Sequence, residues 1–201
     1  FFNFLLNLHQ VTYRITHMIP KFYYFIDKFN TNEIIKLDKN IALIYRNYNI
    51  KYDIKQIAKI KDFTKRNKRK LFIANNLKLA IQLRLDGVYI PSFNKNLFFK
   101  NLNIHKKFLI IGSAHNSIEI INKQKQGCKA IFISPIFKNK KNKFFLDIKR
   151  YNIITRLIKT KIIALGGINS SNLKRLNVTN SYGYASITWI KKNRPKKLGR
   201  F

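Results

Sequence analysis

LFIANNLKLAIQLRLDGVYI, residues 71–90, holds two apolar runs on either side of a helical pattern, and this stretch decides the fold. KLFIA (70–74) and GVYI (87–90) are short and almost continuously apolar, which is typical of strands that are covered on both faces. One side of the intervening helix would carry Leu77, Ala80, Ile81 and Leu85. The pair Asp86-Gly87 ends that helix just before the second strand. The stretch therefore predicts a strand–helix–strand unit, which favours a parallel sheet.

Strand-like runs of the same kind recur along the chain, each followed by a polar stretch. The other runs are FYYFI (22–26), IALIYR (41–46), FLIIG (108–112), AIFIS (130–134), KIIALGG (161–167) and GYASIT (183–188). Further helices are expected over 53–66 with Asp53 as N-cap, 117–126 and 147–158, and from Ser170 onward. Eight such units predict an α/β protein with a single (β/α)8 TIM barrel. A doubly wound open sheet is the alternative, but no GxGxxG follows the first strand.

The domain organisation follows from where these units lie among the 201 residues. We expect a barrel over 21–190, preceded by an N-terminal extension (1–20) and followed by a basic tail (191–201). The opening FFNFLLNLHQ lacks a basic start and a cleavage site, so it is not expected to be a signal peptide. The true start of the chain is left open because the sequence begins at Phe1 and not at Met.

The compartment is predicted from cysteine content and hydropathy. The single Cys128 excludes a disulfide framework and a cysteine-based zinc site, and it fits a reducing cytosol. The sequence contains no run of 18 apolar residues, so no membrane span is expected. A cytoplasmic protein with no membrane contact is therefore expected, and its oligomeric state is left open.

The net charge of +33, from 41 basic and 8 acidic residues, invites a nucleic-acid interpretation. The basic runs are KRNKRK (65–70), KNKKNK (138–143) and the tail. However, Asn, Ile, Phe and Tyr are over-used together with Lys, and all have AT-rich codons, which favours codon bias over selection for phosphate binding. We therefore expect most of the charge on outer helix faces and no nucleic-acid partner. The shortage of acids limits any mechanism that needs paired carboxylates.

A phosphate site is predicted after the last two strands, where TIM barrels commonly bind phosphate. Gly166-Gly167 would let backbone amides approach an anion, at the start of a helix capped by Ser170 or Ser171. The eighth strand ends in Ser186, Ile187 and Thr188, whose hydroxyls and amides would face the same anion. A tight turn is the alternative explanation of the two glycines.

Four blocks, DGVYIP (86–91), GSAHN (112–116), ISPIF (133–137) and ALGGIN (164–169), carry a family resemblance. In this order and spacing, over roughly residues 20–190, the chain resembles the thiamine phosphate synthase and thiazole tautomerase (TenI-like) family. It is most similar to a divergent branch common in alphaproteobacteria, in which the second strand is followed by Arg-x-Tyr, here within IALIYRNY (41–48). The resemblance implies a (β/α)8 barrel of vitamin B1 synthesis. Synthase members join hydroxymethylpyrimidine diphosphate to thiazole phosphate and release pyrophosphate, so small phosphorylated substrates are the implied partners.

The resemblance also implies site residues, of which some are retained. The family arginine that meets the diphosphate falls on Arg46, whereas the neighbouring lysine falls on Tyr48. The serine of the fifth-strand block is retained as Ser113. The thiazole-phosphate site is retained as Gly166, Gly167, Ile187 and Thr188.

Other implied positions have changed. The two aspartates that bind magnesium fall on Asn75 and Asn94, and a neutral amide oxygen should bind Mg²⁺ poorly without substrate phosphates to help. After the sixth strand, Asn139 and Lys141 occupy threonine positions, and Lys143 replaces the family lysine only with a one-residue slip. We expect Arg46 and three loop lysines to supply positive charge to the departing diphosphate. The lysines are Lys140, Lys141 and Lys143.

The tautomerase comparison turns on histidine. The catalytic histidine of that enzyme falls on Pro135, and His115 is the one histidine expected near the barrel mouth. His115 is expected to cap the following helix, with a proton carrier as the functional alternative. Three hypotheses remain: a thiamine phosphate synthase; a non-catalytic or regulatory binder of thiazole phosphate or thiamine phosphate, or a tautomerase-like relative; and, remotely, a nucleic-acid binder.

Overall fold

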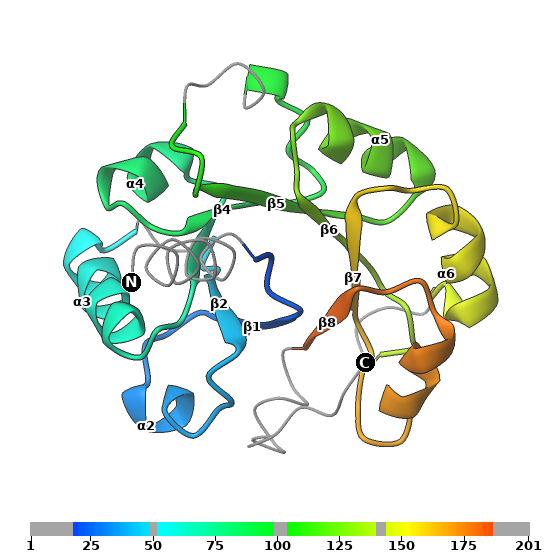
Figure 1. Cartoon of the computed structure of the whole chain (residues 1–201), viewed down its shortest axis with the longest axis horizontal. Helices are drawn as coiled ribbons and strands as arrows, with labels where there is room; N and C mark the ends of the chain where they lie inside the picture. The colour runs from blue at the N-terminus through cyan, green and yellow to red at the C-terminus, as the bar shows by residue number, and fades with distance from the viewer. Residues whose placement is uncertain (1–17, 49–51, 99–103, 140–143, 187–201) are drawn as a thin grey trace, which may run out of the picture.

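Eight parallel strands close into a barrel in the computed structural model, which describes residues 18–48, 52–98, 104–139 and 144–186 (Figure 1). The strands are β1 (Phe22–Ile26), β2 (Ile41–Tyr45), β3 (Leu71–Ala74), β4 (Gly87–Ile90), β5 (Leu109–Ala114), β6 (Ala130–Ile133), β7 (Lys161–Leu165) and β8 (Gly183–Ser186). Each strand pairs with the next in sequence, and β8 pairs with β1 in the register Tyr23↔Ala185, which closes the ring. The predicted (β/α)8 barrel is confirmed, and the open sheet is wrong.

Short helices surround the barrel (Figure 1). They are α2 (Thr31–Ile34), α3 (Ile54–Arg66), α4 (Leu77–Gln82), α5 (Ser117–Lys125), α6 (Asp147–Thr155) and the 3₁₀ helix η2 (Leu173–Val178). The predicted N-cap of α3 is confirmed, because the Asp53 carboxylate accepts a hydrogen bond of 3.2 Å from the N–H of Gln56. The one-turn helix α2 was not predicted from the sequence. Within the described parts of the chain, no helix combines the length and the apolar character that crossing a membrane requires.

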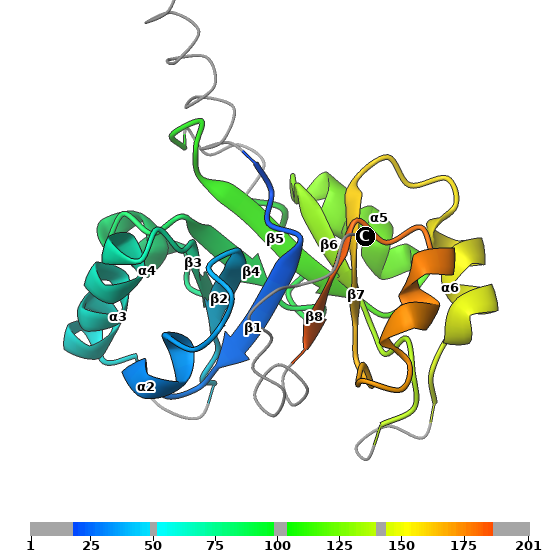
Figure 2. The same ribbon diagram turned by 60° about the horizontal axis from the view of Figure 1, so that its bottom comes forward.

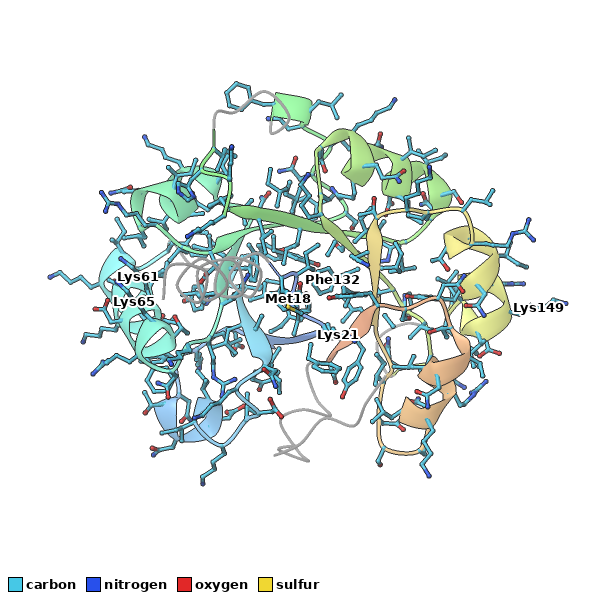
Figure 3. All side chains as sticks on the ribbon, viewed as in Figure 1. Met18, Lys21, Lys61, Lys65, Phe132 and Lys149 are labelled. Atoms are coloured by element: carbon cyan, nitrogen blue, oxygen red, sulfur yellow. The ribbon has the colours of Figure 1, made fainter. Side chains whose placement is uncertain are left out.

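The interior of the barrel is filled by aromatic rings. The buried rings are those of Tyr23, Phe25, Phe72, Tyr89 and Phe132. Phe132 lies near the barrel axis in Figure 3, with its ring centroid 4.8 Å from Tyr23 and 5.5 Å from Tyr89. Edge-to-face contacts of this kind contribute beyond the buried area. The barrel is therefore a packed core, and a ligand must bind at one of its ends.

Basic side chains lie both on helices and in loops: of the 29 in the described ranges, 12 fall in helices, so the expectation that most of the charge lies on outer helix faces is wrong. Lys61 and Lys65 of α3 and Lys149 of α6 point away from the barrel in Figure 3. Arg69 and Lys123 contradict the expectation, since their exposed fractions are 5% and 1%. Both donate hydrogen bonds to buried carbonyl oxygens, which offsets the cost of burying the charge, although the Nε of Arg69 has no partner among the described residues.

Arg69 also changes the interpretation of the basic run 65–70. Its guanidinium donates hydrogen bonds to the carbonyl oxygens of Ile34, Leu37, Asp38 and Ile41, with the bond to Leu37 at 2.7 Å. Burial lowers the pKa of Arg69, and the charge of Asp38 opposes that shift. Arg69 therefore ties the segment after α2 to the barrel, and it is not available to bind a nucleic-acid phosphate.

Candidate active site

The carboxyl ends of the strands gather the described candidate residues at one end of the barrel. In Figure 2, β1 points downward, and all strands run parallel to it. Arg46 follows β2, Asn75 follows β3, His115 follows β5 and Gly166 follows β7. Asn139 lies in the loop after β6 and is half-buried. Five candidates fall outside the described residues, and their predicted roles stay predictions; they are Lys140, Lys141, Lys143, Ile187 and Thr188.

Arg46 lies over the aromatic layer that fills the barrel. Its guanidinium carbon is 4.7 Å from the ring centroid of Phe25, and Phe25 packs edge-on against Tyr89 with centroids 5.3 Å apart. An arginine cation above a ring face is attracted by the ring quadrupole. The contact limits the orientations of the guanidinium, whose planar fork suits a phosphate.

A cavity of about 320 Å³ opens beside Arg46, at the carboxyl ends of β1 and β2. Its polar lining includes Tyr24, Asp27, Asn30 and Glu33, and the Tyr24 hydroxyl donates a hydrogen bond to the Glu33 carboxylate. Burial, followed by the bond to Glu33, raises the pKa of Tyr24. The contact between Tyr24 and Glu33 could not be predicted from the sequence, because the four-residue helix α2, which places Glu33 beside β1, is too short to show a periodic pattern.

Ser113 lies deeper than its predicted role suggests. The residue is only 5% exposed, and its hydroxyl hydrogen-bonds Tyr89. Burial is the main cause that raises the pKa of Tyr89, while Ser113 and then Arg46 oppose it. Tyr89 was not predicted as a site residue, because a tyrosine within an apolar strand has the pattern of core packing. A direct role of Ser113 toward substrate stays a prediction.

His115 does not cap the following helix, which corrects the sequence-based expectation. The N-cap of α5 is Asn116, whose side-chain oxygen accepts a hydrogen bond of 2.9 Å from the N–H of Glu119. The Glu119 carboxylate returns to accept from the N–H of His115, one residue before the N-cap, at 2.8 Å and from the side-chain amide of Asn116 at 3.2 Å. The physical reason is position: Asn116 occupies the N-cap, from which a short side chain with an oxygen atom reaches the N–H groups of the first turn, whereas His115 lies one residue earlier.

The His115 ring joins two loops instead. Its Nδ1 lies 2.6 Å from the carbonyl oxygen of Ser134, which follows β6. A carbonyl oxygen only accepts, so Nδ1 carries the proton. In the neutral ring, Nε2 is then the atom with a free electron pair, which is compatible with the proton-carrier alternative.

Gly166 and Gly167 adopt positive φ angles of +92° and +71°, and the loop after β6 crosses them closely. A Cβ on Gly167 would lie 2.3 Å from the carbonyl oxygen of Phe137, and one on Gly166 would lie 2.8 Å from the Cβ of Pro135. The Phe137 N–H donates a hydrogen bond of 3.1 Å to the Gly166 carbonyl. Close packing of two loops therefore requires glycine here, and this requirement does not depend on a bound anion.

The predicted helix beginning at Ser170 is wrong in its start and its cap. The 3₁₀ helix η2 begins at Leu173, and Ser171 donates from its hydroxyl to the side-chain oxygen of Asn169 at 2.6 Å. Asn172 accepts from the Asn169 N–H at 2.9 Å and donates to the Gly167 carbonyl at 2.8 Å. The asparagine pair satisfies the loop backbone first, so the serines have no helix to cap.

Asn75 and Asn94 hydrogen-bond each other directly. The Asn94 Nδ2 donates to the Asn75 Oδ1 at 2.7 Å, and the Asn94 Oδ1 accepts from the N–H of Asn96 at 2.9 Å. Both groups are neutral, and each amide oxygen already accepts a hydrogen bond. Over the described ranges, no group of three His, Cys, Asp or Glu side chains could hold a metal ion. The pair therefore does not fit the magnesium site that the family resemblance implies, because magnesium is bound chiefly by carboxylates and phosphates.

Comparisons with known proteins show which family the chain is similar to. A family model described as thiamine monophosphate synthase matches residues 30–190. The thiamine-phosphate synthase of Clostridium tetani is 30% identical over 143 residues, covering 67% of this chain and 66% of that protein. That of Prochlorococcus marinus strain AS9601 is 30% identical over 126 residues, covering 61% of this chain. Those residues are 36% of the Prochlorococcus protein, so this chain spans little more than a third of that relative's length.

A solved structure gives the same fold. The thiamine phosphate pyrophosphorylase from Pyrococcus furiosus superposes with a TM-score of 0.69 over 88% of this chain and 93% of that chain. At 17% sequence identity, this likeness shows the barrel and no more. The family match covers most of the chain, from just before α2 to beyond β8. The chain belongs to the thiamine monophosphate synthase family.

Proposed function

We propose that this protein is a thiamine phosphate synthase, which joins hydroxymethylpyrimidine diphosphate to thiazole phosphate. The observation that carries the proposal is the position of Arg46 after β2, held over Phe25 beside a cavity of about 320 Å³ whose other lining residues belong to β1, α2 and the segment between them. Gly166-Gly167 lies at the end of β7, separated from Arg46 by β8 and β1. Anions bound at these two separate places would match the two phosphorylated substrates of the proposed reaction.

The reaction needs positioning and positive charge. The thiazole nitrogen donates its electron pair to the methylene carbon of the pyrimidine, a C–N bond forms, and the C–O bond to the diphosphate breaks. Pyrophosphate leaves with the electrons of that bond. Arg46 would hold the diphosphate and stabilise the charge that grows on it. The loop lysines Lys140, Lys141 and Lys143 would add charge, and a triple alanine variant with full turnover would remove them from the mechanism.

A non-catalytic phospho-ligand binder is the second candidate. It is supported by Asn75 and Asn94, which fall where the family resemblance implies magnesium ligands but are neutral amides hydrogen-bonded to each other. Such a protein would bind thiazole phosphate or thiamine phosphate at the glycine loop without joining the substrates. A cytoplasmic location is proposed with either function, because the single Cys128 is a buried free thiol.

The test is product formation by the purified protein from both substrates, with Mg²⁺ and with EDTA in separate reactions. Thiamine phosphate and pyrophosphate in equal amounts support the synthase. Binding of thiazole phosphate without turnover in either reaction supports the second candidate and overturns the first. R66M is the matched control for R46M, because Arg66 is exposed at the end of α3.

A further inference from the structure

A buried ammonium group lies under the loop that follows β4. Lys123 of α5 is 1% exposed, and its Nζ donates to the carbonyl oxygens of Pro91 at 2.8 Å and Asn94 at 2.7 Å. Its third donor reaches the side-chain oxygen of Gln126 at 2.9 Å. All three acceptors are neutral oxygens, and together they use the three donors of the ammonium group. Burying a charge costs free energy, and an apolar side chain could fill the same space without that cost. We therefore expect a role of the Lys123 ammonium group in addition to packing.

Gln126 completes the grip on the same loop. It is fully buried, and its Nε2 donates to the carbonyl oxygens of Asn94 at 2.9 Å and Asn96 at 2.8 Å. The Asn94 carbonyl accepts from both side chains. Lys123 and Gln126, which we name the Lys123–Gln126 clamp, therefore hold the backbone of the loop at Pro91, Asn94 and Asn96.

The clamp determines how two amides face the barrel mouth. With the Asn96 backbone in place, its N–H must meet an oxygen, so the Asn94 side chain turns Oδ1 toward it. Nδ2 of Asn94 then faces Asn75 and donates to Oδ1. The bond to Asn94 uses the Oδ1 of Asn75 and leaves its Nδ2 uninvolved, on an exposed residue at a φ of +56°, a conformation that asparagine tolerates well. The pair thus presents N–H donors where a carboxylate pair would present acceptors.

We propose that the Lys123–Gln126 clamp positions the Asn75–Asn94 pair as a direct hydrogen-bond donor to the diphosphate, with no divalent cation between them. This inference rests on the proposed function. Amide N–H groups complement phosphate oxygens, whereas carboxylates need a cation between. Lys123 and Gln126 are positioning residues, since they touch the loop and not the ligand.

The test measures binding of inorganic pyrophosphate and of pyrimidine diphosphate by calorimetry in EDTA. K123M removes the ammonium group and keeps a stem of similar length, and we expect about tenfold weaker binding because the donors shift. K125M is the matched control, since Lys125 is an exposed lysine of the same helix. K125M should bind within about twofold of wild type.

Four results overturn the inference in distinguishable ways. Equal binding by wild type and K123M overturns the clamp alone. A strict need for Mg²⁺ overturns the direct contact. Failure of wild type to bind either probe overturns the proposed function as well. Should K123M not fold, Q126M replaces it with the same expectation, and unchanged hydrogen exchange at the Asn94 and Asn96 amides in that variant also overturns the clamp.

Discussion

The guanidinium carbon of Arg46 lies 4.7 Å from the ring centroid of Phe25, so the barrel core itself holds the cation at the mouth. Phe25 contacts Tyr89 and Phe132, and this layer of rings forms the floor of the proposed diphosphate site. A charge supported from below by packed rings keeps its position while a substrate enters.

Replacing Arg46 should affect turnover far more than stability. We expect R46M to lower kcat/KM for the pyrimidine diphosphate about 10²-fold, because the bidentate contact to phosphate is lost. R46K keeps the charge and loses the planar fork, so its decrease should be smaller. Steady-state rates of pyrophosphate release, compared with the R66M control, measure both. A decrease of the same size in R66M would contradict the assignment.

Gly167 should tolerate no side chain. In G167A, the Cβ meets the Phe137 carbonyl and the backbone has a φ of +71°, so we expect a loss of about 3 kcal/mol or more in the free energy of unfolding. Gly127 provides the control, since its φ is +80° but no atom lies within 4 Å of the place that a Cβ would take. G127A should therefore cost only about 1 kcal/mol. Urea denaturation of both variants separates the packing cost from the backbone cost.

His115 can be tested by an asparagine substitution. In H115N the side-chain N–H₂ can still donate to the Ser134 carbonyl, but no group replaces Nε2. If the ring only joins the two loops, H115N keeps turnover, and H115A loses about 1 kcal/mol of stability. We expect this structural outcome. A large loss of kcat in H115N with unchanged stability would instead assign proton transfer to Nε2.

Asp86 should make stability depend on pH. Burial raises the pKa of this carboxyl, against the opposing effects of the Leu71 N–H and of Lys70. The unfolded chain therefore releases this proton first, from a pKa of about 3.9, and stability falls as pH rises from there through the folded pKa. D86N keeps an acceptor for the Leu71 N–H and should flatten this part of the profile. Urea midpoints of wild type and D86N, measured from about pH 3 to about pH 7, give the difference.

A double substitution should bring back a need for metal. In N75D/N94D, two carboxylates replace amides whose nitrogen and oxygen are 2.7 Å apart, and their repulsion is relieved by a divalent cation. We expect the variant to bind Mg²⁺ alone in calorimetry and to gain thermal stability from it, whereas wild type does neither. Stabilisation of wild type by Mg²⁺ to the same extent would contradict the neutral-pair interpretation.

The sequence by itself determined the barrel and the order of its parts. Apolar runs such as KLFIA, punctuation such as Asp86-Gly87 and the N-cap Asp53 are local signals, because strand burial, chain reversal and helix initiation each depend on a few neighbouring residues. The same holds for Arg46 and Gly166, whose places at strand ends follow once the strands are identified.

Only the tertiary structure decided which groups meet. The Asn75–Asn94 bond, the contact of His115 with Ser134 and the clamp by Lys123 all join residues from different strand–helix units. No local pattern distinguishes Lys123 from the exposed lysines of the chain, since its burial depends on carbonyl groups of a loop about 30 residues away. The composition determines how many charged residues the chain has, whereas tertiary packing determines which of them, such as Arg69 and Lys123, are buried.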